Sequence, residues 1–222
     1  VTGVQTCALP IYGLRRAALG VLRILIEKEL NLNLASLVDA SLAQYTHEFN
    51  RDETRKLVLD FINDRLRGYC LDKSYAPDEF DAVMTVNPTQ PLDFIKRLQA
   101  VKAFRQLPEA ESLAAANKRI RNILKKSETA PAMHVGDLLE AEEKQLLAVA
   151  KQSAADIQPF LDKKDYQAAL SRLAQTEPAV NAFFDKVMVM CDNLDLRARR
   201  LALLNMLSEQ FLQIADISKL QS

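Results

Sequence analysis

The sequence is poor in residues that interrupt helices, and this scarcity already limits its fold class. It has only five glycines among 222 residues; tryptophan is absent too, although that residue does not interrupt helices. Alanine, leucine, lysine, arginine and glutamate are abundant instead, and these residues favour helices. Few segments show the alternating β-branched pattern that is typical of strands. The composition therefore predicts an all-α protein.

Cysteine and long apolar runs are also scarce. The three cysteines, Cys7, Cys70 and Cys191, form no CxxC pair and no metal-ligand spacing with His47 or His134. We therefore expect inert thiols, no metal site and a reduced, cytoplasmic environment. No apolar run reaches the roughly 18 residues that a membrane-spanning helix needs, and no segment has the pattern of a secretory signal.

The chain has no formal net charge, because 29 basic residues balance 29 acidic ones. One predicted helix nevertheless concentrates positive charge, with five cations and no acid between Ser112 and Ser127. Its polar positions at helical spacing are Lys118, Arg121, Asn122 and Lys125, and its apolar stripe is Ala116, Ile120, Ile123 and Leu124. Such a face suits a phosphate backbone, but a merely solvated helix face explains this segment equally well.

A second basic cluster comes from Arg197, Arg199 and Arg200. Arg200 shares a side of its predicted helix with several leucines, so it must reach water or pair with an acid such as Asp185 or Asp195. Arg197 and Arg199 are expected to be more accessible to phosphate.

No catalytic constellation is recognisable. The sequence contains no Gly-rich phosphate loop, no GxSxG elbow and no HExxH motif. Glu140, Glu142 and Glu143 share one predicted helix, but a solvated face explains them better than an acid–base pair. The apolar run that begins at Phe183 is expected to belong to the core, with a groove for a nucleobase as the alternative. We therefore predict neither catalytic residues nor metal ligands.

The first eleven residues do not read like the start of a gene. They lack an initiator methionine, and one back-translation reproduces a common sequencing-library adapter whose next base fits a codon for Tyr12. We expect residues 1–11 to be translated adapter rather than native sequence. On this hypothesis the rest of the chain is the C-terminal part of a longer protein.

Turn signals divide the remaining sequence into a succession of helices. The expected helices cover residues 14–30, 34–45, 52–66, 78–85, 91–106, 111–126, 136–160, 166–176, 178–189 and 195–214. Gly68 is expected to end the third helix, and residues 127–133 to form a polar loop. A break near residues 107–112 separates a helical segment, 12–107, from a second part, 108–222. The second part is predicted to be an antiparallel bundle of about five helices.

Several motifs, in the same order, resemble the β subunit of bacterial heterotetrameric glycyl-tRNA synthetases. They are Leu14–Gly20, Tyr75–Asp78 followed by Asp81–Val83, Asn117–Leu124, Phe183–Val189, Leu201–Leu204 and Ala215–Ser218. The resemblance covers the chain from Gly13 onward. Arg199 stands where the family usually has Asn, and this added charge is not expected to weaken RNA binding.

The resemblance implies a fold and a role. Residues 108–222 are expected to form an anticodon-binding domain of the type shared with arginyl-tRNA synthetase, called DALR, and residues 12–107 a helical part of the subunit body. The implied partners are glycine tRNA and an α subunit, in a heterotetramer of two α and two β chains. ATP, with Mg²⁺, would be used at the α subunit, so no cofactor is expected in this chain, and neither DNA nor a membrane is an expected partner.

This role makes the two basic clusters candidates for contact with the anticodon stem-loop. The candidate RNA-binding residues are Lys118, Arg119, Arg121, Asn122, Lys125, Arg197, Arg199 and Arg200. Cations would hold the backbone, and Asn122 would meet a base edge. Two alternatives are a helical assembly module without direct RNA contact and an independent enzyme, against which the missing catalytic motifs argue.

Overall fold

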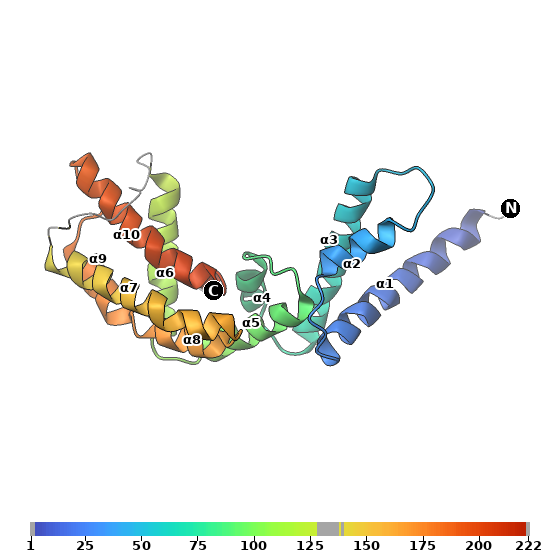
Figure 1. The fold of residues 1–222 in the computed structure, drawn as a ribbon, viewed down its shortest axis with the longest axis horizontal. Coiled ribbons are helices and arrows are strands. Elements are labelled where there is room, and N and C mark those ends of the chain that lie inside the picture. Colours follow the sequence, from blue (N-terminus) through green and yellow to red (C-terminus); the bar gives the residue numbers. More distant parts are fainter. Residues whose placement is uncertain (1–2, 128–137, 139, 221–222) are drawn as a thin grey trace. The chain divides into compact units, whose positions relative to one another are not determined.

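The computed structural model describes residues 3–127, 138 and 140–220, with side chains from residue 13 onward. These residues form ten α-helices and one short 3₁₀ helix, and they contain no strand (Figure 1). The all-α prediction is confirmed. The chain divides into two compact units, one formed by residues 1–80 and 87–95 and the other by residues 81–86 and 96–222.

In the first unit, two helices pack against a third, α3. Its elements are α1 (Gly3–Glu27), α2 (Leu34–Leu42), α3 (Arg51–Asp72) and the first parts of α4 (Pro77–Met84) and α5 (Pro91–Phe104). Both α1 and α2 pack against α3. Leu22 and Leu66 are buried in this unit, and the rings of Phe80 and Phe94 lie 4.9 Å apart.

The third predicted helix was expected to end at Gly68, and this expectation is wrong. The helix α3 continues to Asp72, with Gly68 exposed inside it and Leu66 and Cys70 buried on one face. Ser74 instead adopts the left-handed conformation just beyond the helix, with φ 62°. Its N–H donates to the carbonyl of Leu71 at 2.9 Å. Burial of one more turn thus outweighs the local preference of glycine for a helix end.

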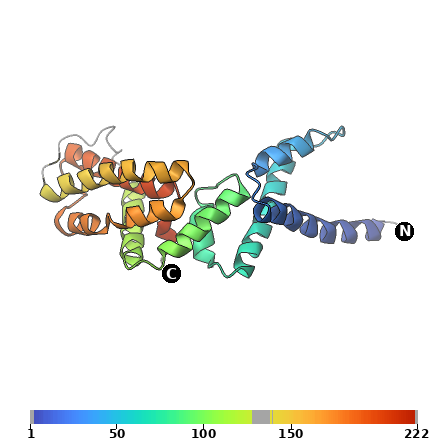
Figure 2. The same cartoon turned by 60° about the horizontal axis from the view of Figure 1, so that its bottom comes forward.

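The second unit is a bundle, as the sequence predicted. Its elements are the remainder of α4 and α5, then α6 (Ala110–Lys126), α7 (Ala141–Asp162), α8 (Tyr166–Ala174), α9 (Glu177–Lys186), α10 (Leu194–Leu212) and the 3₁₀ helix η1 (Ile217–Lys219). The helix α7 packs against α8, α9 and α10, and α6 packs against α9, α10 and η1. Figures 1 and 2 both show α7 and α8 side by side. Phe104, Phe183 and Phe211 are almost completely buried in this unit.

The borders of other elements shift by a few residues from the prediction. The helix α1 begins at Gly3 instead of residue 14, and α7 begins at Ala141 instead of residue 136. Apart from Ser127, the predicted loop at 127–133 lies outside the described residues. The division expected at residues 107–108 falls between α5 and α6, whereas the two compact units divide within α4 and within α5. Among the described residues, no helix is long and apolar enough to cross a membrane.

The two cysteines whose side chains are described differ in their surroundings. Burial raises the pKa of the Cys70 thiol to about 12, whereas Cys191 is only half-buried. Because the thiolate is the reactive form, we expect iodoacetamide to modify Cys191 but not Cys70 in the folded chain at pH 8. Peptide mass spectrometry after short exposure measures this, with the chain in urea as the control in which both react. Equal modification of both residues in the folded chain would contradict the prediction.

Candidate nucleic-acid interface

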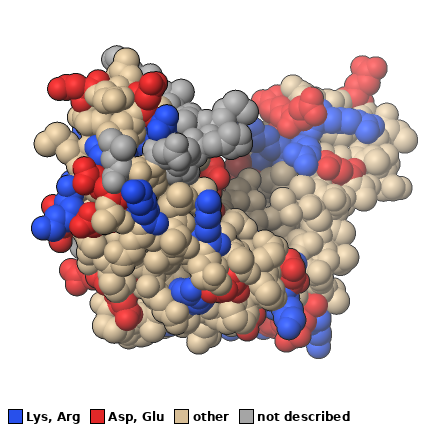
Figure 3. Space-filling model, turned by 60° about the vertical axis from the view of Figure 1, so that its left-hand side comes forward, with Lys and Arg blue, Asp and Glu red and all other residues tan. Residues whose placement is uncertain are grey.

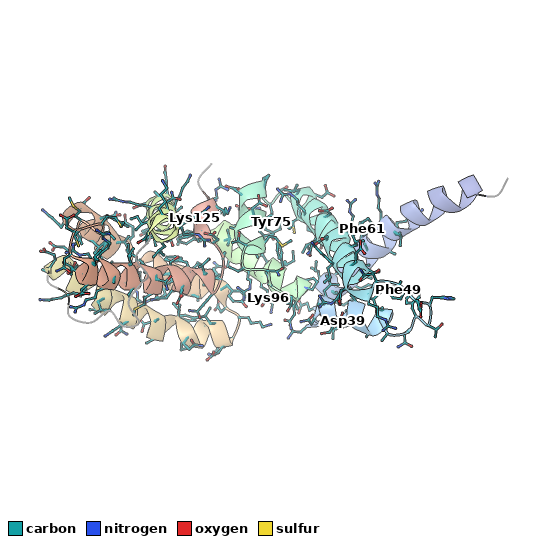
Figure 4. The ribbon with its side chains drawn as sticks, turned by 90° about the horizontal axis from the view of Figure 1, so that it is seen from above. Asp39, Phe49, Phe61, Tyr75, Lys96 and Lys125 are labelled. Atoms are coloured by element: carbon teal, nitrogen blue, oxygen red, sulfur yellow. The ribbon has the colours of Figure 1, made fainter. Side chains whose placement is uncertain are left out.

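The helix α6 is held in the bundle by one side only. Its own Leu113 and Ile120 are buried on this side, and near its start the hydroxyl of Ser112 donates to Glu177 of α9 at 2.7 Å. The opposite side of α6 is exposed. We define the α6 basic face as the exposed polar residues of its second half, Lys118, Arg119, Asn122, Lys125 and Lys126; the exposed Glu111 lies in the first turn and is not part of it. In Figure 4, Lys125 is labelled on α6, which this view shows nearly along its axis.

Most of the positive charge on this face is not neutralised within the described residues. There, Lys118, Lys125 and Lys126 form no ion pair. The guanidinium carbon of Arg119 lies 4.3 Å from the ring centroid of Phe184, which belongs to α9. This cation–π contact positions Arg119 without cancelling its charge.

Two hollows flank the α6 basic face. The larger, which we call the α10-side hollow, has a volume of about 740 Å³ and lies between α6, α10 and η1. The smaller, which we call the Met190-side hollow, has a volume of about 570 Å³ and includes Arg119, Lys126 and Met190 in its lining. Lys118 and Asn122 line both hollows. Figure 3 shows basic and acidic groups interspersed on one face of the molecule.

Helical spacing placed Arg121 on the same face as Lys118 and Lys125, but Arg121 is less exposed than these two lysines. It lines the α10-side hollow, where its Nη1 lies 3.2 Å from Oδ2 of Asp216, a carboxylate whose side chain is only 2% exposed. The other oxygen of Asp216 accepts hydrogen bonds from the backbone N–H and the hydroxyl of Ser218. Arg121 is therefore tied to the turn that follows α10, although 38% of its side chain remains exposed.

Arg200 is part of the core, which corrects its place among the candidate RNA-binding residues. It is 5% exposed, its Nε donates to Glu143, and its Nη1 donates to the carbonyl of Met188 at 2.8 Å. Of the two possibilities expected for Arg200, reaching water or pairing with an acid, the structure shows the second, but the acid is Glu143 and not Asp185 or Asp195, the examples offered. Glu143 is fully buried, so its assignment to a solvated helix face is wrong. Since the Arg200 guanidinium cannot reach a phosphate outside, we remove it from the set.

The other two arginines of α10 each have contacts of their own. Arg197 donates from Nε and Nη2 to the carbonyl of Cys191, at 2.8 and 2.5 Å, and so holds the segment that precedes its helix. Arg199 is half-buried and has a contact of its own. Neither residue lines the hollows beside α6. The structure thus brings the α6 candidates together beside two hollows that the arginines of α10 do not line.

Some residues of this surface were not predicted. Lys126 belongs to the same basic run as Lys125 and could have been included by its position in the run. Lys219, Asn205 and Ser208 reach the α10-side hollow from η1 and α10. Only the packing of α6 against these two elements brings them near Lys118, and a single sequence carries no signal of that packing.

Two family models match the chain, one in each half. Residues 113–221 match the DALR anticodon binding domain, which covers α6 to η1 and both hollows. Residues 10–85 match the glycyl-tRNA synthetase beta subunit. The bundle therefore has the fold of an anticodon-binding domain of the aminoacyl-tRNA synthetases.

Similar proteins point to one synthetase. The glycine–tRNA ligase beta subunit of Pseudomonas aeruginosa (strain LESB58) is 48% identical over 211 residues, which are 94% of this chain and 31% of that protein. The same subunit of Photobacterium profundum is 44% identical over 212 residues, and that of Coxiella burnetii is 46% identical over 212 residues. These matches cover 95% and 94% of this chain, and 31% of each relative. The chain belongs to the family of glycyl-tRNA synthetase beta subunits, and it spans about a third of the length of these relatives.

Proposed function

We propose that this chain is the tRNA-recognition part of a glycine–tRNA ligase, and that the α6 basic face contacts the anticodon stem-loop of glycine tRNA. One observation carries the proposal. Lys118, Lys125 and Lys126 form no ion pair among the described residues, and they lie between two hollows in the region that matches the anticodon-binding model. Lysines in this arrangement can neutralise phosphates, and hollows of this size can admit unstacked bases.

The proposed mechanism is binding rather than bond making. The lysines supply affinity that depends on salt, because neutralised phosphates release their counterions. Asn122 lines both hollows and has an amide that can meet a base edge. Arg119, positioned by Phe184, adds a cation beside the Met190-side hollow. The chain thus orients the tRNA, and a partner performs the chemistry.

The rest of the proposal concerns the complete ligase. An α subunit would attach glycine to the tRNA with ATP and Mg²⁺, in a cytoplasmic heterotetramer of two α and two β chains. The relatives are named as beta subunits, which supports the existence of a partner subunit. In the described parts of this chain, no group of three His, Cys, Asp or Glu side chains could hold a metal ion. The assignment of Mg²⁺ and ATP to the α subunit is part of the proposal and does not rest on that absence.

Reversing two charges of the α6 basic face tests the proposal. Lys118→Glu combined with Lys125→Glu is expected to weaken binding of a glycine tRNA transcript about a hundredfold at moderate salt, because two attractive interactions with phosphate become repulsive. The slope of log affinity against log salt should also become shallower by about 0.7–0.9 for each phosphate that is no longer neutralised. Fluorescence anisotropy of labelled tRNA, titrated with the full chain, measures both quantities.

The chain offers a matched control for this variant. Lys144 and Lys151 are exposed on α7 with the same spacing, so Lys144→Glu with Lys151→Glu changes the net charge equally on a helix that lines neither hollow. This control should bind tRNA almost as the parent does. Arg121 is left intact because a glutamate there would face the buried carboxylate of Asp216. Equal affinity of the two double variants, or tRNA binding that does not respond to salt, would favour an assembly module instead.

A further inference from the structure

We infer that the α10-side hollow is a binding site for one nucleotide of single-stranded RNA, in which Arg121 holds the phosphate and Asp216 fixes Arg121. This inference rests on the proposed function and assigns a place to one part of the RNA. Its first support is local charge. Four cations line the hollow, Lys118, Arg121, Lys125 and Lys219, against the single carboxylate of Asp216.

The second support is the way in which Arg121 is held. Asp216 is almost fully buried, and one of its oxygens is already fixed by the N–H and hydroxyl of Ser218. The other oxygen, Oδ2, accepts no hydrogen bond from the described residues, although Arg121 Nη1 lies 3.2 Å away. A carboxylate with so little freedom restricts the guanidinium beside it. Arg121 keeps 38% of its side chain exposed, so the rest of its planar donor set can serve a bound anion.

Arg97 fixes the same corner from the other side. Its Nη1 donates to the carbonyls of Gln213 and Ile214 at 2.6 and 2.9 Å, at the end of α10. The backbone N–H of Asp216 donates to the carbonyl of Ala82 at 2.9 Å. The segment that carries Asp216 is thus bound at several points before any ligand arrives. A rigid corner of this kind holds the Arg121–Asp216 pair in place, and such preorganisation favours tight binding.

The size and the remaining lining of the hollow decide which ligand fits. A volume of about 740 Å³ exceeds the needs of a lone phosphate and lies in the usual range for small-ligand sites. Leu124 and Leu212 offer apolar surface to the face of a base, whereas Asn122 and Asn205 offer amides to its edge. The lining therefore offers a cation to the phosphate, apolar surface to the base face and amides to the base edge, as binding of a single-stranded nucleotide requires.

Three variants and one control test the assignment in the full chain, with a labelled anticodon hairpin of glycine tRNA as the probe. Arg121→Gln should weaken binding about tenfold, the loss of one charge-assisted hydrogen bond, and lower the salt slope by about 0.7. Asp216→Asn should weaken binding by a similar factor with an unchanged salt slope, because the cation remains but is no longer fixed. Asn205→Phe should weaken binding at least tenfold by filling the hollow, again with an unchanged slope. Gln145→Phe, on the exposed side of α7, should bind as the parent does.

The outcomes separate this inference from the proposed function. If Arg121→Gln, Asp216→Asn and Asn205→Phe all bind as the parent does, while reversal of Lys118 and Lys125 weakens binding, the hollow is not the site and the function stands. If that reversal also has no effect, both proposals fail. Displacement of the hairpin by a short polyglutamate peptide at equal charge concentration would overturn the assignment to RNA in favour of an acidic protein segment. Circular dichroism of each variant establishes that it is folded, and a misfolded Asn205→Phe leaves the other two variants to decide.

Discussion

Replacing Arg200 by alanine is expected to lower the free energy of unfolding of the second unit by about 3–5 kcal/mol, the usual cost of removing one partner from a buried ion pair. Glu143 is fully buried, so the substitution leaves its carboxylate without a cation in a place that water does not reach. The carbonyl of Met188 loses its donor as well. Urea denaturation followed by circular dichroism measures the change.

Two further variants show whether the cost comes from the unpaired charge. Lys144→Ala removes an exposed cation next to Glu143 and should change the free energy of unfolding by no more than about 0.5 kcal/mol. Arg200→Met combined with Glu143→Leu removes both charges and should recover most of the lost stability, since apolar residues often replace buried ion pairs without loss. A single Arg200→Ala variant as stable as the parent would show that the pair contributes nothing.

The helices were predictable because local signals and hydrophobic spacing agree. Asn33, Asn50 and Asn193 each precede a helix, and in each case the side-chain oxygen accepts a hydrogen bond from an N–H in the first turn. Gly68 shows where such signals fail. It has the local character of a helix end, but the helix continues because the next turn brings Cys70 into the core.

The exposed part of the site was predictable for the same reason. Hydrophobic spacing assigned one side of α6 to the core, so Lys118 and Lys125 had to lie outside. The roles of Arg121 and Arg200 could not be predicted, because their partners, Asp216 and Glu143, are distant in sequence and come close only when the helices pack. A basic residue within a cluster is therefore a weak guide to RNA contact until the positions of the acids are known.

Phe183 and Phe184 show the same limit of sequence-based prediction in the core. The sequence could not divide Phe183 from Phe184, but the structure does: Phe183 is fully buried, and Phe184 is half-buried beneath Arg119. Phe183→Ala is therefore expected to lower the free energy of unfolding by about 3–5 kcal/mol, as other buried Phe truncations do. Phe184→Ala should cost only about 1–2 kcal/mol, from partial burial and one cation–π contact. Urea denaturation of both variants measures the difference.

The two variants should also differ in RNA binding, measured at a temperature where both are folded. Phe184→Ala frees Arg119 from its ring, so it is expected to weaken tRNA binding a few-fold although it destabilises the protein less. Phe183→Ala removes a ring that packs edge-on against Phe184, with centroids 5.5 Å apart, but keeps both partners of the Arg119–Phe184 contact, so it should bind tRNA almost as the parent does. The larger loss of stability and the larger loss of affinity would then belong to different residues of one dipeptide. If affinity instead follows stability in both variants, Arg119 does not depend on Phe184 for its position at the RNA surface.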